Sequence, residues 1–309
     1  MNEPLISVIV LTYNSKDFVE ETLESIFSQS YQAIELIVAD DCSQDGTVTL
    51  VNNWLETKKE RFVHTKIIVP EQNTGTSANC NRGLHAASGV WVKYIAGDDI
   101  LDSNFFSEML ELLINPDFNV IAGRIFEFRT DSSESTPLWP SFEFPTDYLI
   151  QRRLQLVKGL LLAPSVVIRR STLEEQNGFD TNYRVLEDDP MWIKLSFAGH
   201  LFYYSPNSVV YYRQHVASIN SMEARATFYR KPVFLNDLIN FGRRIRFPHL
   251  RKEKLWIHAI IFYLCLSLEK MIYKNGSRLD NFPNLWLKKI IGFLSSIYFS
   301  LPIKPLFTK

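Results

Sequence analysis

The sequence of 309 residues has few cysteines and no long apolar run. Its three cysteines, Cys42, Cys80 and Cys265, are widely spaced and include no CxxC pair, which excludes a disulfide framework and a cysteine-based zinc site. This cysteine usage favours a reducing cytoplasm. The longest apolar candidate, residues 255–268, is shorter than the roughly 18 residues that a membrane-spanning helix requires. The N-terminal stretch lacks a basic leader, so we expect a first strand there rather than a secretory signal.

The charges of the chain nearly cancel, since there are 33 lysines and arginines and 34 aspartates and glutamates. No overall field would recruit nucleic acid, and we therefore expect no nucleic-acid partner. Hydrophobic residues make up 46% of the chain, which is typical of a globular protein with a core and excludes a disordered one. Charge must therefore act locally.

Short apolar runs alternate with segments of helical periodicity over the first hundred residues. The runs at residues 6–11, 35–39, 66–69 and 90–95 predict strands, and the segments at 17–29, 47–58 and 77–87 predict helices. This alternation predicts an α/β fold whose mostly parallel sheet is covered by helices on both faces. Farther along we expect strands at residues 166–168, 202–204 and 209–211, a helix at 190–198 and an exposed proline-rich loop at 129–147.

Polar side chains follow three of the predicted strands. They are Thr12, Tyr13 and Asn14 after the first, residues 40–43 after the second, and Asp98 and Asp99 after the fourth. Because the carboxyl ends of parallel strands meet at one edge of a sheet, we expect these groups to form one ligand-binding rim. The chain has neither GxGxxG nor GxxxxGK[ST], which excludes the dinucleotide fingerprint and the P-loop as explanations of that rim.

The paired carboxylates at this rim have two interpretations. Asp98 and Asp99 could cap a turn and face water, or they could support a magnesium or manganese ion that keeps positions open for substrate phosphates. Helix capping explains Ser43 and Asp45 in the second cluster but does not require Asp41. A carboxylate at that position can accept the imide N–H of a pyrimidine base.

Two later clusters have the same ambiguity. Glu187, Asp188 and Asp189 open a predicted helix, where the dipole alone favours carboxylates, but one that faced the rim could act as a general base. Arg213 and His215 end a strand and offer a guanidinium that could pair with phosphate and an imidazole that could bind metal. A structural role for either residue remains open.

The ordered set of motifs resembles the family 2 glycosyltransferases. The matching segments are SVIVLTYN at residues 7–14, LESIFSQSY at 23–31, DDCSQDGT at 40–47, Asn73 to Gly75, Gly97 to Asp99, and Glu187 and Asp188 with Trp192. The resemblance covers about residues 4 to 220, and it implies the nucleotide-sugar-binding GT-A fold. The catalytic domain would be residues 1–223, with a nucleotide-sugar half at about 1–100 and an acceptor half at about 101–223, followed by a helical region at 224–309.

The resemblance also implies roles for individual residues. Thr12, Tyr13 and Asn14 would border the nucleoside, Asp41 would accept from a uracil-type base, and Asp98 would lie near the ribose and the metal. Asp99 and His215 would bind the divalent cation, manganese or magnesium, and Arg213 would lie near the diphosphate. Asp188 would be the catalytic base of an inverting displacement. The remaining substrate-binding positions are Asn73, Gly75 and Glu187.

The chain departs from the family pattern at three places, of which Leu11-Thr12 in place of the usual proline before Tyr13-Asn14 is a modest change. The family commonly has Ala-Arg-Asn where this chain has Asn79-Cys80-Asn81, which puts the usual arginine contact in doubt. The order Asp188-Asp189-Pro190 departs from the commoner Glu-Asp-x-Asp, so Asp189 remains a rival base.

The implied function is transfer of a sugar from a nucleotide sugar, with UDP favoured, to an acceptor hydroxyl in the synthesis of a capsule, O-antigen or similar polysaccharide. The acceptor would be a glycan or a lipid-linked sugar. The aromatic and basic C-terminal region suits a peripheral contact at the inner face of the plasma membrane, and packing on the catalytic domain or in a homodimer is equally open. The alternatives are a nucleotidyltransferase acting on sugar phosphates and a non-catalytic sugar-binding relative.

Overall fold

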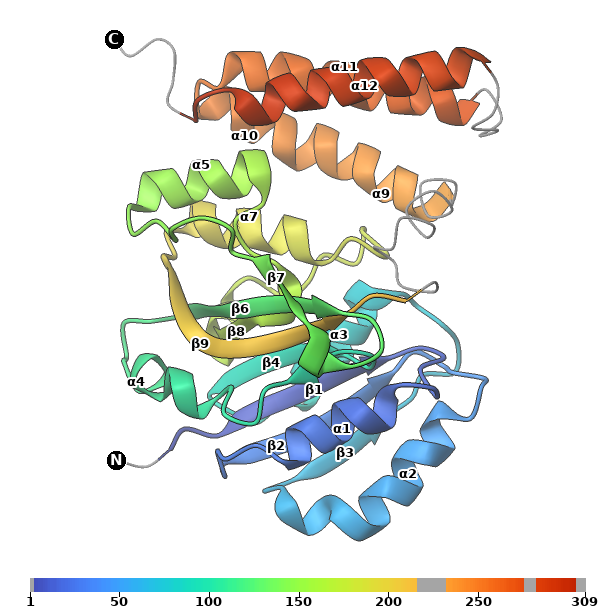
Figure 1. Ribbon diagram of the computed structural model, residues 1–309, viewed down its shortest axis with the longest axis vertical. Coiled ribbons are helices and arrows are strands. Elements are labelled where there is room, and N and C mark those ends of the chain that lie inside the picture. The colour runs from blue at the N-terminus through green and yellow to red at the C-terminus, as the bar shows by residue number, and fades with distance from the viewer. Residues whose placement is uncertain (1–2, 216–231, 275–281, 304–309) are drawn as a thin grey trace.

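The computed structural model describes residues 3–215, 232–274 and 282–303. Its centre is a nine-stranded mixed sheet in which eight strands follow the order β3-β2-β1-β4-β8-β6-β9-β5 and β7 pairs with β6 (Figure 1). Helices pack on both sides of the sheet, and a further layer of helices follows at the C-terminal end. The predicted α/β architecture is confirmed.

The first half of the sheet is parallel, as the sequence predicts. Its strands are β1 (Ile6–Thr12), β2 (Ile34–Asp40), β3 (Thr65–Ile68) and β4 (Trp91–Ala96), joined by helices α1 (Val19–Phe27), α2 (Thr47–Lys58) and α3 (Thr76–Ala86). Helices on both faces bury β1 and β2, which explains their nearly continuous apolar sequences. Register pairs Thr12 with Asp40, so the polar residues that follow the two strands emerge at the same edge.

The second half of the sheet is mixed. Its strands are β5 (Ile100–Leu101), β6 (Val120–Phe128), β7 (Thr136–Trp139), β8 (Val166–Arg169) and β9 (Phe202–Arg213). β8 runs antiparallel between β4 and β6, so β6 and its parallel neighbour β9 point in the same direction as β4. The carboxyl end of β9 therefore reaches the same rim as the ends of β1, β2 and β4.

Two expectations for this half were wrong, and one helix was not expected. Residues 202–204 and 209–211 belong to one strand, because a register shift against β6 near Gly123 absorbs the break around Pro206. Part of the proline-rich loop forms β7. Pro137 is tolerated in this strand because β7 pairs with β6 at an edge of the sheet. Helix α5 (Tyr148–Lys158) was not predicted, and Asp147 caps it by accepting from the Ile150 amide at 2.8 Å.

Short helices α4 (Leu110–Leu113) and α6 (Arg170–Glu175) and the longer α7 (Asp188–Ala198) complete the layers against the sheet. Alternate residues of β1 face opposite cores: Val8 and Val10 pack with α1 and α2, and Ile9 packs with α3 and α7. The strands are thereby fixed in register, because a slip of one residue would exchange the two faces.

The C-terminal region forms a helical layer. It comprises α9 (Pro232–Phe241), a π-helical turn (Gly242–Arg246), α10 (Phe247–Lys252), α11 (Trp256–Lys274) and α12 (Phe282–Ser300). A third apolar cluster joins this layer to helices α5 and α7, because Leu156 of α5 and Ile193 of α7 pack among its residues. The predicted domain boundary at residues 223 and 224 lies outside the described residues. Within the described ranges, no helix is long and apolar enough to cross a membrane.

Candidate active site

The rim begins where β1 and β2 end. Asp40 is buried and accepts hydrogen bonds from the Thr12 hydroxyl at 2.7 Å and the Ser43 amide at 2.7 Å. Thr12 is also buried, so it supports the rim rather than bordering a ligand directly. Tyr13, in contrast, is 52% exposed, and Asn14 adopts a left-handed backbone with φ 52° while its side chain accepts from the Gln44 amide. Of the three predicted residues, Tyr13 and Asn14 are therefore the ones placed to face a ligand.

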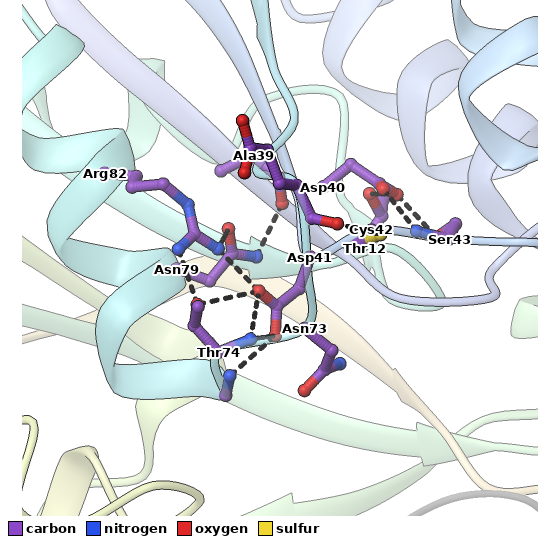
Figure 2. A network of polar contacts seen from close by, with 12 residues as sticks. Thr12, Ala39, Asp40, Asp41, Cys42, Ser43, Asn73, Thr74, Asn79 and Arg82 are labelled. Carbon is purple, nitrogen blue, oxygen red and sulfur yellow. Dashed lines mark hydrogen bonds and ion pairs between the residues drawn. The ribbon is translucent and has the colours of Figure 1, made fainter.

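Asp41 is the centre of a polar network that links β2 to the loop before α3 (Figure 2). Its carboxylate accepts from the backbone amides of Thr74 at 3.0 Å and Gly75 at 2.7 Å, and it pairs with Arg82 at 2.6 Å. With these donors in place Asp41 positions the loop, and any base contact at this point would also involve Thr74 and Arg82. The sequence interpretation missed Arg82, although Arg82 lies three residues after Asn79 on the same helix face and bonds to it.

Gly75 brings the second half of the protein against this network. Its φ of 94° suits glycine, and an added Cβ would lie 2.3 Å from the Arg184 Cγ and 2.5 Å from the Arg184 carbonyl oxygen. Arg184 donates to both the backbone and side-chain oxygens of Asn73, at 3.1 and 2.9 Å. Asn73 and Gly75 therefore hold the segment that leads into α7 against the nucleotide half.

Asp98 and His215 converge at the ends of β4 and β9. The Asp98 carboxylate lies 3.0 Å from the His215 Nε2, and both side chains are partly exposed. The His215 ring also packs beside Phe18, with centroids 4.5 Å apart. The two groups were predicted for the same site, and the structure brings them together.

Asp99 points the opposite way, into the protein. It is 1% exposed and accepts from the Arg213 amide at 3.0 Å. Its other carboxylate oxygen is buried without a hydrogen-bond partner among the described residues. The Asp99 carboxylate therefore lies behind the Asp98 turn, and its role as a metal ligand stays a prediction.

A buried lysine lies behind Asp99. Lys93 is fully buried in β4 and donates to the carbonyl oxygens of Tyr94, at 2.8 Å, and Pro164. Burial lowers the pKa of the Lys93 ammonium to about 7. Burial, followed by the charge of Asp98, raises the pKa of the Asp99 carboxyl well above its ordinary value. Both shifts follow from the burial of these two groups behind the Asp98 turn.

The Arg213 side chain is buried at the end of β9. It is 4% exposed and lies between the rings of Phe18 and Phe128, with its guanidinium carbon 5.0 and 4.5 Å from their centroids. Its Nε donates to the Asp98 carbonyl at 2.8 Å, and its terminal nitrogen pairs with Glu21 at 2.5 Å. Arg213 therefore holds the backbone of Asp98 in place, and its position near the diphosphate stays a prediction.

The acidic residues at the start of α7 have distinct environments. Asp189 pairs with Arg246 of the C-terminal layer at 3.0 Å, and the Asp189 amide donates to the Asp188 carboxylate at 2.7 Å. Burial and the neighbouring Asp189 charge raise the pKa of Asp188 to about 6. Burial and the Asp188 charge raise the pKa of Glu187 to about 8. The pairing of Asp189 leaves Asp188 as the better candidate for a base that works near neutral pH.

The comparisons with known proteins agree with this geometry. The family profile described as "Glycosyl transferase family 2" matches residues 7–176. The chain belongs to this family. This glycosyltransferase is 28% identical over 227 residues to the "Putative teichuronic acid biosynthesis glycosyltransferase TuaG" of Bacillus subtilis, with 72% of this chain and 84% of that protein covered.

Solved structures show that the family 2 enzyme has the GT-A fold. S. aureus TarS, residues 1–349, in complex with UDP-GlcNAc superposes with a TM-score of 0.60 at 17% identity, covering 92% of each chain. The mannosyltransferase PcManGT of Pyrobaculum calidifontis, in complex with GDP-Man and Mn2+, superposes with a TM-score of 0.59 at 17% identity, covering 96% of this chain and 87% of that one. The family match sets aside the nucleotidyltransferase and non-catalytic alternatives.

Asp98 and His215 fit a divalent cation by their chemistry. A carboxylate oxygen and an imidazole nitrogen are ligands that manganese accepts, and two protein ligands leave positions for phosphate oxygens and water. Over residues 3–215, 232–274 and 282–303 no group of three or more His, Cys, Asp or Glu side chains could hold a metal ion. A cation at the rim of this glycosyltransferase would therefore depend on the substrate to complete its coordination.

A cavity of about 500 Å³ lies elsewhere, near the start of β9. Its lining includes Arg124, Phe142, Phe144 and Tyr204, and none of the predicted site residues. Phe202 lines it as well, at the end of β9 opposite to Arg213 and the rim. The cavity is thus separate from the site that the carboxylates define.

Proposed function

We propose that the protein is an inverting glycosyltransferase that moves a sugar from a nucleotide sugar to an acceptor hydroxyl. A UDP-sugar is the favoured donor, and the product is a cell-envelope polysaccharide. The similar TuaG is named for teichuronic acid biosynthesis, and structural neighbours are described as complexes with UDP and UDP-GlcNAc. We keep the prediction of a cytoplasmic location, which rests on the three widely spaced cysteines.

The nucleoside would bind along the ends of β1 and β2. The exposed Tyr13 ring can stack on a base or ribose, and Asn14 lies beside it in a fixed left-handed turn. The Asp41 network would meet the edge of the base, with a carboxylate that accepts N–H groups and the Arg82 guanidinium that donates to carbonyl oxygens. This pairing complements the adjacent N–H and C=O groups of uracil.

The diphosphate would lie against Asp98 and His215. These two residues, rather than Asp99, would hold the divalent cation, since they are the partly exposed pair at the rim. A bound cation would supply Lewis-acid stabilisation of the charge that develops on the departing diphosphate. Arg213 and Asp99 act one layer behind, where they fix the backbone of the Asp98 turn.

The environment of Asp188 is the observation that best supports the proposed transfer reaction. Its pKa of about 6 lets it remain mostly deprotonated at pH 7 and still accept a proton from a hydroxyl. In the reaction, Asp188 removes the acceptor proton as the acceptor oxygen bonds to the anomeric carbon and the bond to the diphosphate oxygen breaks. This single displacement inverts the anomeric centre. Glu187, with a pKa of about 8, stays protonated at pH 7 and can donate a hydrogen bond to a substrate oxygen.

The test compares two neighbouring substitutions. Asp188→Asn should reduce donor turnover at least about a thousandfold, because it removes the base but keeps the shape of the side chain. Asp189→Asn is the matched control and should keep most of the activity at pH 7.5. Donor use is measured with a panel of nucleotide sugars and manganese, and product configuration is read from the anomeric coupling in NMR. A retained anomeric configuration, or near-normal turnover by Asp188→Asn, would contradict the mechanism.

A further inference from the structure

The C-terminal helical layer has two different faces. Its inner face shares an apolar cluster with α5 and α7, as described above. Helices α11 and α12 contact each other and form the outermost layer, on the side away from the sheet (Figure 1). The outer face of α11 exposes large apolar side chains, namely Trp256, Ile257, Ile260, Tyr263, Leu264 and Met271, and α12 adds Phe293 and Phe299.

The exposed residues of α11 form a stripe. Ile260 follows Trp256 by four residues, and Tyr263 and Leu264 follow Ile260 by three and four, so the four side chains lie on one side of the helix. Ile260 is 59% exposed and Phe293 is 67% exposed. Isolated apolar residues on a protein surface are ordinary, but a continuous row of this size marks an interaction surface.

Acidic and basic residues are unevenly distributed along the chain. Residues 232–309 contain 13 lysines and arginines but only 4 aspartates and glutamates, whereas the preceding 231 residues contain 20 and 30. Two of the four acidic residues are buried and have partners. Glu253 pairs with Arg152 and Arg153, and Asp237 accepts a hydrogen bond from the Val185 amide. The C-terminal layer is therefore strongly basic on a chain whose net charge is close to zero.

Basic side chains lie directly beside the apolar stripe. Arg251, Lys252 and Lys254 are exposed immediately before α11, and the Arg251 guanidinium lies 5.4 Å from the Trp256 ring centroid. Tryptophan and tyrosine next to arginine and lysine, with aliphatic residues between them, match the depth profile of a lipid interface. Apolar groups enter the acyl region, and the cations remain among the headgroups.

We propose that the outer face of α11 and α12 binds an anionic lipid surface. The charge excess selects this occupant over a second copy in a symmetric dimer, because such a dimer would bring two basic faces together. Helices that lie in the plane of the interface through such a face hold the enzyme at the membrane without crossing it. This inference goes beyond the sugar-transfer chemistry and does not depend on it.

The experiment measures cosedimentation of the full chain with vesicles. The wild type should bind vesicles with about 30% phosphatidylglycerol in phosphatidylcholine, bind pure phosphatidylcholine at least about tenfold less, and be released by about 0.5 M salt. Ile260→Gln with Leu264→Gln should weaken binding about tenfold, and Arg251→Glu with Lys254→Glu should do the same. All four positions are exposed, so thermal unfolding should stay close to that of the wild type.

The matched control is Val63→Gln with Val69→Gln, which makes the same polar change at two exposed apolar positions of the nucleotide half. It should bind like the wild type. Unchanged binding by the α11 variants, or no preference for the anionic vesicles, would overturn the proposal. Sedimentation velocity without lipid supplies the second measurement. A wild-type dimer that Ile260→Gln with Leu264→Gln converts to monomer would make this face a subunit interface and would also overturn it.

Discussion

Replacing Arg246 with alanine should move the acidic limb of the pH–rate profile upward by about one pH unit. Arg246 pairs with Asp189 at 3.0 Å, and Asp189 is the immediate neighbour of the proposed base Asp188. The Arg246 charge lowers the pKa of Asp188, while burial and the Asp189 charge raise it to about 6. Without Arg246 the pKa of Asp188 rises further, and a smaller fraction of the base is deprotonated in weak acid.

The size of the shift follows from the distance and the partial exposure of the pair. A unit charge beyond about 4 Å contributes less than about 1 kcal/mol in a water-like dielectric and less than about 4 kcal/mol at an effective dielectric constant of about 20. The Arg246 side chain is 14% exposed and Asp188 is shielded by burial, so the interaction between them lies between these limits. A middle value of about 1.4 kcal/mol equals one pH unit. Turnover at pH 6 should then fall about fivefold, with almost no change at pH 8.5.

The assay is kcat measured from about pH 5 to pH 9 with saturating donor and manganese. Asp189→Asn removes a negative charge beside Asp188, so it should move the acidic limb downward, opposite to Arg246→Ala. Arg243→Ala, an exposed arginine in the same helical turn, is the control and should leave the profile in place. Shifts of the same sign in Arg246→Ala and Asp189→Asn, or no shift in either, would refute the reasoning. A general loss of folding cannot imitate two shifts of opposite sign.

Two further substitutions test the supporting structure. Asp99→Asn should keep manganese-dependent activity within about threefold, because the amide oxygen can still accept from the Arg213 N–H, whereas loss of the manganese response would restore Asp99 as a ligand. Gly75→Ala should lower the free energy of unfolding, measured in urea, by about 3 kcal/mol. The added Cβ would clash with the Arg184 backbone, and the positive φ at this position is unfavourable for alanine. Gly159→Ala, with φ 72° and no neighbour within 4 Å, should lower it by only about 1 kcal/mol, and equal losses would show that contact with Arg184 is unimportant.

Local patterns in the sequence were enough to predict the nucleotide half. The strands at residues 6–11 and 35–39 are continuous apolar runs because helices cover both faces of the sheet, and the structure confirms both. The grouping of polar residues at one rim follows from the parallel direction of these strands. The strands of the second half were harder to predict from the sequence. β8 runs antiparallel between its neighbours, and β9 continues past Pro206 because its register against β6 shifts there.

The division of roles within the site could not be predicted from sequence. Asp98 and Asp99 lie in and directly after the turn that follows β4, and only the position of β9 decides that Asp99 is the buried one of the two. The partner of Arg213 is Glu21, 192 positions away, and no local pattern links them. Arg213 therefore resembled a phosphate ligand in sequence, although its ion pair and two aromatic neighbours make it a support for the Asp98 turn.

The departure at Cys80 connects these findings. Cys80 is buried in α3 at the place where the family commonly has arginine, and Glu187 and Asp188 lie close enough to raise its thiol pKa, after burial as the larger cause. An arginine at this position would have lowered the pKa of both carboxylates, whereas a neutral cysteine leaves them raised. Among the described residues, Arg246 forms an ion pair with Asp189, which lies beside Asp188. Arg246 belongs to the C-terminal layer. Arg246 belongs to the same layer whose outer face carries the apolar stripe, so a charge of this layer lowers the pKa of the proposed base.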